Sequence, residues 1–106
     1  MDKPTATITV ARQAPNDVKV RQIYISLDGK RVAELLYGDT FTIEVEPGEH
    51  WLRANNTLVW KTLDCKLAPG EHAKFSVVNR PGLGTYAMLS LLGSGPIYLT
   101  FQRTDS

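Results

Sequence analysis

Apolar and polar residues alternate in short runs along most of this chain, which is the pattern of strands with one buried face. The run from Thr40 to Glu46 is the clearest, because every second residue in it is apolar. Clusters of glycine, proline, asparagine and aspartate separate the runs. The strands expected on this basis are 7–12, 20–27, 31–36, 40–46, 50–54, 58–67, 73–77 and 97–102.

About seven to eight short strands with a turn after each one predict a mainly-β fold. We expect a single antiparallel β-sandwich of immunoglobulin-like or transthyretin-like type over residues 1–106. Residues 1–6 form a polar lead-in, and residues 83–102 form an apolar C-terminal segment that is expected to pack on the sandwich. Residues 85–92 fit a short helix or another strand, and the helix is the preferred interpretation.

Asp28-Gly29 lies between two alternating runs and predicts a tight hairpin, because a type I′ turn needs positive φ at both central residues. A two-residue loop here would place Ile25 opposite Val32. Tyr37-Gly38-Asp39 predicts a further turn.

Four residues occur twice, as Pro47-Gly48-Glu49-His50 and as Pro69-Gly70-Glu71-His72. Proline followed by glycine favours a type II turn. The first copy fits a hairpin, which would pair Val45 with His50, Ile43 with Leu52 and Phe41 with Ala54. The second copy reverses the apolar phase of the next strand, so it needs either a bulge or a crossing to the other sheet. The twist of a type II turn favours the crossing.

Asn55-Asn56 tolerates left-handed backbone and is expected to form a two-residue turn. That turn would place Trp51 opposite Trp60, with Arg53 and Leu58 on the same surface. If this surface is exposed, these four residues form a candidate ligand-binding or partner-binding patch. The alternative is that the apolar C-terminal segment covers the two tryptophans, and burial of this aromatic area makes the covered interpretation the preferred one.

The bulk properties set limits on partners and compartment. A chain of 106 residues matches one domain, and its net charge of +1 gives no general attraction to nucleic acid. The single cysteine excludes an internal disulfide and fits a reducing compartment. The N-terminal residues lack the apolar core of a signal peptide, and no apolar run is long enough for a transmembrane helix, so the cytoplasm is the favoured location.

The runs IYISLDGKRVAEL, FTIEVEPGEHWLRA and KLAPGEHAKFSV follow one another between Ile23 and Val78. This order of strand, Asp-Gly turn, strand and two Pro-Gly corners resembles the small bacterial β-sandwich domains of the PEGA kind and their relatives of unknown function. The resemblance covers a little over half of the chain. It implies a non-catalytic binding or spacer module of cell-surface or membrane-linked proteins.

Catalytic and metal-binding residues are not expected. His50 and His72 are only weak metal candidates, because no third ligand is spaced beside either of them. Glu49 and Glu71 could act as a carboxylate pair only if the two turns lie close together. Cys65 shares an apolar face with Leu63 and Leu67 and is expected to be a buried, inert thiol.

Three functional hypotheses remain, none of them enzymatic and none with a cofactor. The first is a non-catalytic binding module for another protein or a cell-envelope component. The second is a membrane-surface protein that uses the apolar residues 83–92, although this segment has no Lys or Arg to attract anionic lipid. The third is binding of a small ligand or carbohydrate at Trp51 and Trp60. The oligomeric state is not predicted.

Overall fold

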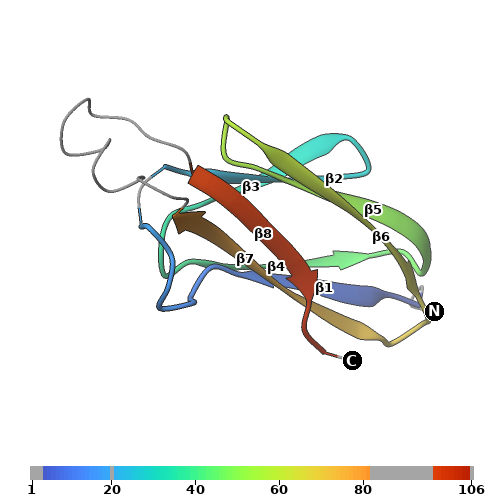
Figure 1. The fold of residues 1–106 in the computed structure, drawn as a ribbon. Coiled ribbons are helices and arrows are strands. Elements are labelled where there is room, and N and C mark those ends of the chain that lie inside the picture. The colour runs from blue at the N-terminus through green and yellow to red at the C-terminus, as the bar shows by residue number, and fades with distance from the viewer. Residues whose placement is uncertain (1–3, 20, 82–96, 106) are drawn as a thin grey trace, which may run out of the picture.

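The computed structural model describes residues 4–19, 21–81 and 97–105. These residues form eight strands in two four-stranded sheets, a mainly-β sandwich as the alternation predicted (Figure 1). The strands are β1 (Ala6–Ala11), β2 (Ile23–Leu27), β3 (Lys30–Leu35), β4 (Thr40–Val45), β5 (Gly48–Asn55), β6 (Trp60–Leu67), β7 (His72–Pro81) and β8 (Ile97–Arg103).

The strand order is β4-β1-β7-β8 in one sheet and β3-β2-β5-β6 in the other. All neighbours pair in antiparallel fashion except β1 and β7, which are parallel. The connections β1–β2, β3–β4 and β5–β6, the end of β7 and the start of β8 lie at one end of the sandwich, which we call the loop end (Figure 1). The Asp28-Gly29 turn and both Pro-Gly corners lie at the other end.

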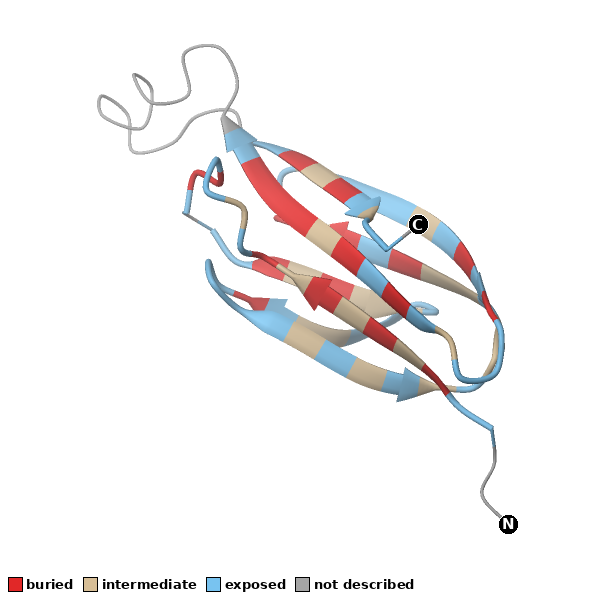
Figure 2. Cartoon of the chain, turned by 90° about the horizontal axis from the view of Figure 1, so that it is seen from below, coloured by how far each residue is buried: buried red, intermediate tan, exposed pale blue. Residues whose placement is uncertain are grey.

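The core lies between the sheets, because successive side chains of a strand point to opposite faces and the apolar set faces the other sheet. Figure 2 shows buried residues alternating with more exposed ones along the strands. Strand β1 has the burial pattern of a half-buried strand, with Ile8 and Val10 fully buried and Thr7 and Thr9 partly exposed. The buried core residues of the other strands are Ile23, Ile25, Leu35, Leu52, Ala54, Cys65, Leu67, Ala73, Phe75, Val77, Leu99 and Phe101.

The Asp28-Gly29 turn is confirmed, with φ of 51° and 90° at its two residues and Leu27 opposite Lys30. The expected pairing of Ile25 with Val32 is wrong, because a β-bulge follows and Ile25 pairs with Ala33. The bulge lets Val32 and Ala33, which are neighbours in sequence, both pack against the core.

The hairpin predicted at the first Pro-Gly is also wrong, because β4 and β5 belong to different sheets. Strand β4 pairs with β1 instead, which places Ile43 opposite Ile8. The partner of β4 is therefore β1, which is distant in the sequence, and not β5, which follows it directly.

The second Pro-Gly passes the chain from β6 to β7 in the other sheet, as its reversed apolar phase predicted. Both corners place glycine at positive φ, 124° at Gly48 and 78° at Gly70. Gly48 lies opposite Leu67, so the two corners are neighbours at one end of the sandwich.

Two expected features lie mainly outside the described residues, and the start of one strand differs from its prediction. The helix predicted for 85–92, and most of the apolar segment expected to cover the tryptophans, lie outside the described residues. Strand β2 begins at Ile23 instead of residue 20, because Lys19 and Arg21 have φ of 70° and 64° and cannot continue a strand.

Candidate functional site

The predicted contact between the two tryptophans is wrong. In the observed register Trp51 lies opposite Asp64, and Trp60 lies opposite Asn55. The two indoles are therefore separated along the strands by about 13 Å, four residues at the usual strand rise. They still point to the same side, the outer face of sheet β3-β2-β5-β6, since cross-strand partners share a face.

Asn56 explains why the β5–β6 loop is longer than the predicted two-residue turn. Its side chain is fully buried, and its Oδ1 accepts the N–H groups of Leu58 (3.0 Å) and Val59 (2.9 Å). Its Nδ2 donates to Oδ1 of Asn79 at 3.0 Å. Asn56 is thus held inside the sandwich, and Thr57 adopts the left-handed conformation instead, with φ of 75°.

The four residues predicted as a patch differ in exposure. Trp60 is 62% exposed and Leu58 46% exposed, whereas Trp51 is partly buried. Arg53 lies between the tryptophans, with its guanidinium 5.3 Å from the ring centre of Trp51 and its Nε donating to Thr62 at 3.1 Å. Arg53 therefore links the two ends of this surface.

Sequence reasoning missed two further members of this surface, Tyr24 and Arg31. Tyr24 lies opposite Asn55, which in turn lies opposite Trp60, so the three side chains form one row across the sheet. The guanidinium of Arg31 lies 3.9 Å from the ring centre of Tyr24. The alternation of Ile23, Tyr24 and Ile25 predicts that Tyr24 points outward, but it does not predict which residues of the neighbouring strands lie beside it. We call the five residues Tyr24, Arg31, Trp51, Arg53 and Trp60 the aromatic face.

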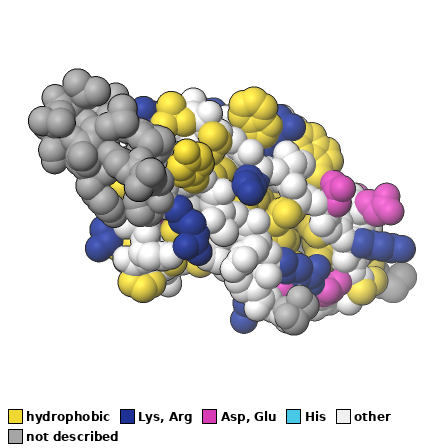
Figure 3. All heavy atoms as spheres, in the orientation of Figure 1, with side chains coloured by type: hydrophobic (Ala, Val, Ile, Leu, Met, Phe, Trp, Pro, Cys, Tyr) yellow, Lys and Arg dark blue, Asp and Glu magenta, His cyan; other side chains and the backbone are white. Residues whose placement is uncertain are grey.

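The outer face of the other sheet has a different chemistry. Its central residues are small, polar or charged: Thr7, Thr9, Thr42, Glu44, His72, Lys74 and Ser76. Oγ1 of Thr9 lies 2.9 Å from Oγ1 of Thr42 and 2.7 Å from Nε2 of His72. Tyr98, which is 55% exposed, lies opposite Arg80 at the β7–β8 edge of this face, so the two outer faces differ mainly in their central residues. Figure 3 shows hydrophobic side chains exposed among Lys and Arg on the molecular surface.

An open hollow of about 650 Å³ lies against β5 and β6 near the Pro-Gly corners. It is lined by Glu49, His50, Trp51, Asp64, Cys65 and Lys66. Trp51 is fixed at this end by the neighbouring turn: Asp28 accepts the Trp51 N–H through Oδ1 (2.9 Å) and donates its own N–H to the Trp51 carbonyl (2.9 Å). Gly29 lies beside the indole, since a Cβ there would be 3.4 Å from Cζ2.

His50 lies between Asp28 and the first corner. Its Nδ1 is 2.7 Å from Oδ2 of Asp28, and its Nε2 is 2.6 Å from the carbonyl oxygen of Glu46. Desolvation opposes the charge on the ring, but the hydrogen bonds to Asp28 and Glu46 outweigh it and raise the pKa of His50. For Asp28, desolvation is likewise outweighed by the bonds from His50 and Trp51, so its pKa is lowered.

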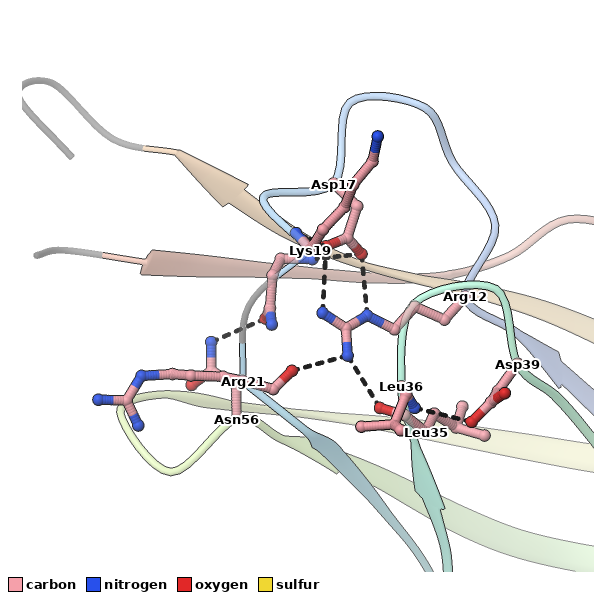
Figure 4. Close-up of polar contacts among 9 residues, drawn as sticks. Arg12, Asp17, Lys19, Arg21, Leu35, Leu36, Asp39 and Asn56 are labelled. Atoms are coloured by element: carbon pink, nitrogen blue, oxygen red, sulfur yellow. Dashed lines mark hydrogen bonds and ion pairs between the residues drawn. The ribbon is translucent and has the colours of Figure 1, made fainter. Parts of the chain in front are cut away.

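A buried ion pair organises the loop end (Figure 4). The side chains of Arg12 and Asp17 are 1% and 0% exposed, and Arg12 donates Nε–H and Nη2–H to the two carboxylate oxygens. Nη1 donates to the carbonyls of Arg21 (2.7 Å) and Leu35 (2.8 Å). This network fixes the β1–β2 connection to the end of β3 and, through a bond from the Asn79 N–H to Asp17, to β7.

Exposed apolar side chains stand on this fixed end. Leu36 and Tyr37 are 56% and 38% exposed in the β3–β4 connection, and Lys19 Nζ lies 4.9 Å from the ring centre of Tyr37. Trp60 and Leu58 belong to the same end, because β6 begins there. The loop end and the aromatic face therefore meet at Trp60.

The weak metal candidates lie apart in the fold. His50 belongs to β5 and His72 to β7, in different sheets. Among the described residues no three His, Cys, Asp or Glu side chains are grouped so that they could hold a metal ion.

The other residues considered for catalysis, Glu49, Glu71 and Cys65, are paired with neighbouring residues or buried. Glu71 accepts the Ala68 N–H and pairs with Arg103, both at 2.8 Å, and these contacts lower its pKa. Glu49 lies opposite Lys66. Cys65 is buried as predicted, and the burial raises the pKa of its thiol.

Comparison with protein families, curated proteins and solved structures finds no match to this chain. In the part of the chain that the structure describes, no helix is long and apolar enough to cross a membrane.

Proposed function

We propose that this chain is a non-catalytic binding module whose recognition surface is the aromatic face, centred on Trp60. The observation that carries the proposal is the 62% exposure of Trp60 on a sheet face that also presents Tyr24 and two arginines. Tryptophan, tyrosine and arginine are the residues most enriched at the energetic centres of interfaces. The middle of the opposite outer face carries threonines and Lys74, and its described residues of this kind, Tyr98 and Arg80, lie at the β7–β8 edge without a tryptophan.

The scaffold beneath this surface suits a binding role. Arg31 and Arg53 each lie over an aromatic ring, at 3.9 Å and 5.3 Å, which limits the rotamers that the rings and the guanidinium groups sample. The buried bonds of Asn56 hold the adjacent loop. A surface that is ordered before binding loses less conformational entropy on association.

The partner that we favour is another protein or a cell-envelope component. The PEGA-like family is proposed for the chain as well, supported by the Asp28-Gly29 hairpin and the two Pro-Gly corners that carry the resemblance. Domains of that kind serve as binding or spacer modules, which agrees with a surface of aromatic and arginine side chains.

Site-specific photo-crosslinking tests the proposal. A photoreactive phenylalanine analogue at position 60 should give discrete covalent adducts in an extract of the source cells. The same analogue at Lys74, which is exposed on the opposite face, should not. Adducts from position 60 should be lost when Tyr24→Ala and Arg53→Ala are added. Equal labelling from positions 60 and 74, or adducts that survive these changes, would overturn the assignment of the surface.

Carbohydrate is a second candidate, favoured by the partly exposed residue Trp51, which lines the same hollow as Glu49, Asp64 and Lys66. An aromatic platform flanked by donors and acceptors suits a sugar ring, whose C–H face stacks on the indole. Titration with neutral trisaccharides should then change the emission of a Trp60→Phe variant, in which Trp51 is the remaining indole. No change at concentrations of ~10 mM, which corresponds to affinity too weak for specific recognition, would exclude this candidate.

A further inference from the structure

The two copies of Pro-Gly-Glu-His place their histidines in different hydrogen-bonding environments. Nε2 of His72 faces the hydroxyl of Thr9 at 2.7 Å, and a hydroxyl can either donate or accept. His50 has an acceptor at each ring nitrogen: the carboxylate of Asp28 at 2.7 Å and the backbone carbonyl of Glu46 at 2.6 Å. Although the two sequence motifs are identical, the surroundings of His50 require a donor at both ring nitrogens, and the hydroxyl beside His72 does not.

A neutral imidazole carries one N–H and one lone pair. Whichever tautomer His50 adopted as a neutral ring, its lone pair would face either a carboxylate oxygen or a carbonyl oxygen at hydrogen-bond distance. A protonated Asp28 could relieve one contact, but Asp28 also accepts the Trp51 N–H and its pKa is lowered, so it stays ionised. The imidazolium is the one ring state that donates to both neighbours.

We propose that His50 is a pH-dependent clamp, which as an imidazolium ties the β2–β3 turn to the β4–β5 corner and holds Trp51 against that turn. The link to Trp51 runs through Asp28, which bonds His50 with one carboxylate oxygen and the Trp51 N–H with the other. Loss of the ring proton removes the donor to Asp28 or the donor to Glu46, and the corner separates from the turn. The presentation of Trp51 beside the hollow then changes with pH.

The groups that face His50 set the pH range of the clamp. They are the carboxylates of Asp28 and Glu46 and, directly opposite on β6, the thiol of Cys65, which burial keeps neutral. Because folding raises the pKa of His50, the stabilisation is complete below its ordinary value of 6.5 and is lost as the pH rises through the higher folded value. Because folding lowers the pKa of Asp28, its part is present above 3.8 and is lost as the pH falls through the lower folded value.

The test uses the Trp60→Phe chain, so that Trp51 alone reports by fluorescence. Its emission and the ¹⁵N shifts of the His50 ring should change together, at one midpoint above pH 6.5, and both ring nitrogens should be protonated below it. Above the midpoint, amide exchange of Trp51 should lose at least ~10-fold of its protection relative to amides of β1, as expected for local opening. The transition should be absent in His50→Gln and retained in the matched control His72→Gln.

Asp28→Asn provides a second variant in case His50→Gln does not fold. Without the carboxylate the transition should move to lower pH. The proposal is overturned if the Trp51 transition persists in His50→Gln, if Asp28→Asn leaves its midpoint in place, or if one ring nitrogen of His50 is unprotonated at ~pH 6. None of these measurements requires the binding partner, so they stand or fall apart from the proposed function.

Discussion

The buried pair of Arg12 and Asp17 allows the sharpest prediction about stability. Both side chains are almost fully buried, and from the described residues the Asp17 carboxylate accepts two hydrogen bonds from Arg12 and one each from the backbone N–H groups of Lys19 and Asn79. Asp17→Asn replaces one acceptor oxygen with an NH₂ group that would point at a donor. It also leaves the Arg12 guanidinium buried without its counter-charge.

Breaking one partner out of a buried ion pair destabilises a protein by about 3–5 kcal/mol, because an uncompensated charge remains inside. That is a large share of the roughly 5–15 kcal/mol that stabilises an ordinary domain. The Asp17→Asn chain should therefore unfold in urea at a much lower midpoint, with an unchanged dependence on denaturant concentration. A loss of less than about 1 kcal/mol would refute the reasoning, since it would place the pair in contact with water.

The pair of Arg103 with Glu71 is the matched control. Its partners are 27% and 34% exposed, and the N···O distance of 2.8 Å is as short as in the buried pair. Solvent screens such a pair, so Glu71→Gln should leave the urea midpoint almost unchanged. Burial, and not the presence of an ion pair, then accounts for the difference between the two variants.

Three further predictions concern the turns. Asn56→Ala removes the hydrogen bonds to Asn79, Leu58 and Val59 and should destabilise the fold by about 1–3 kcal/mol in urea unfolding, whereas an effect near zero would mean that water replaces them. Gly29→Ala combines a φ of 90° with a contact 3.4 Å from the Trp51 indole, and should lower the free energy of unfolding by about 1–2 kcal/mol; unchanged stability would contradict the described turn. The urea midpoint of the wild-type chain should fall as the pH rises through the raised pKa of His50, and this fall should vanish in His50→Gln.

The strands were predicted well from the sequence, because a strand with one buried face has an apolar residue at every second position. The sequence also predicted the Asp28-Gly29 turn and the crossing at the second Pro-Gly, where local backbone preference and apolar phase agree. The hairpin expected at the first Pro-Gly was self-consistent but does not form, because β4 pairs with β1, whose residues lie 29 to 39 positions away in the sequence. Alternation identifies which face of a strand is buried, but it does not identify the neighbouring strand.

The candidate surface was predicted in part. Trp51, Arg53 and Trp60 were placed on one face through the expected Asn55-Asn56 turn, and they do share a face although the register is different. Their spacing was wrong, because nothing local distinguishes an asparagine that forms a turn from one that is buried and bonded to Asn79. Arg31 was missed since its contact with Tyr24 depends on the pairing of β2 with β3 and on the bulge between them.

The proposed binding surface depends on the exposure of Trp60, and iodide quenching of its fluorescence measures this exposure most directly. In a Trp51→Phe chain Trp60 is the remaining indole, and a side chain that is 62% exposed should emit at long wavelength and be quenched by iodide nearly as well as free tryptophan. A blue-shifted emission that resists iodide would mean that Trp60 is covered in the folded chain. That result would contradict the assignment of this face as the binding surface.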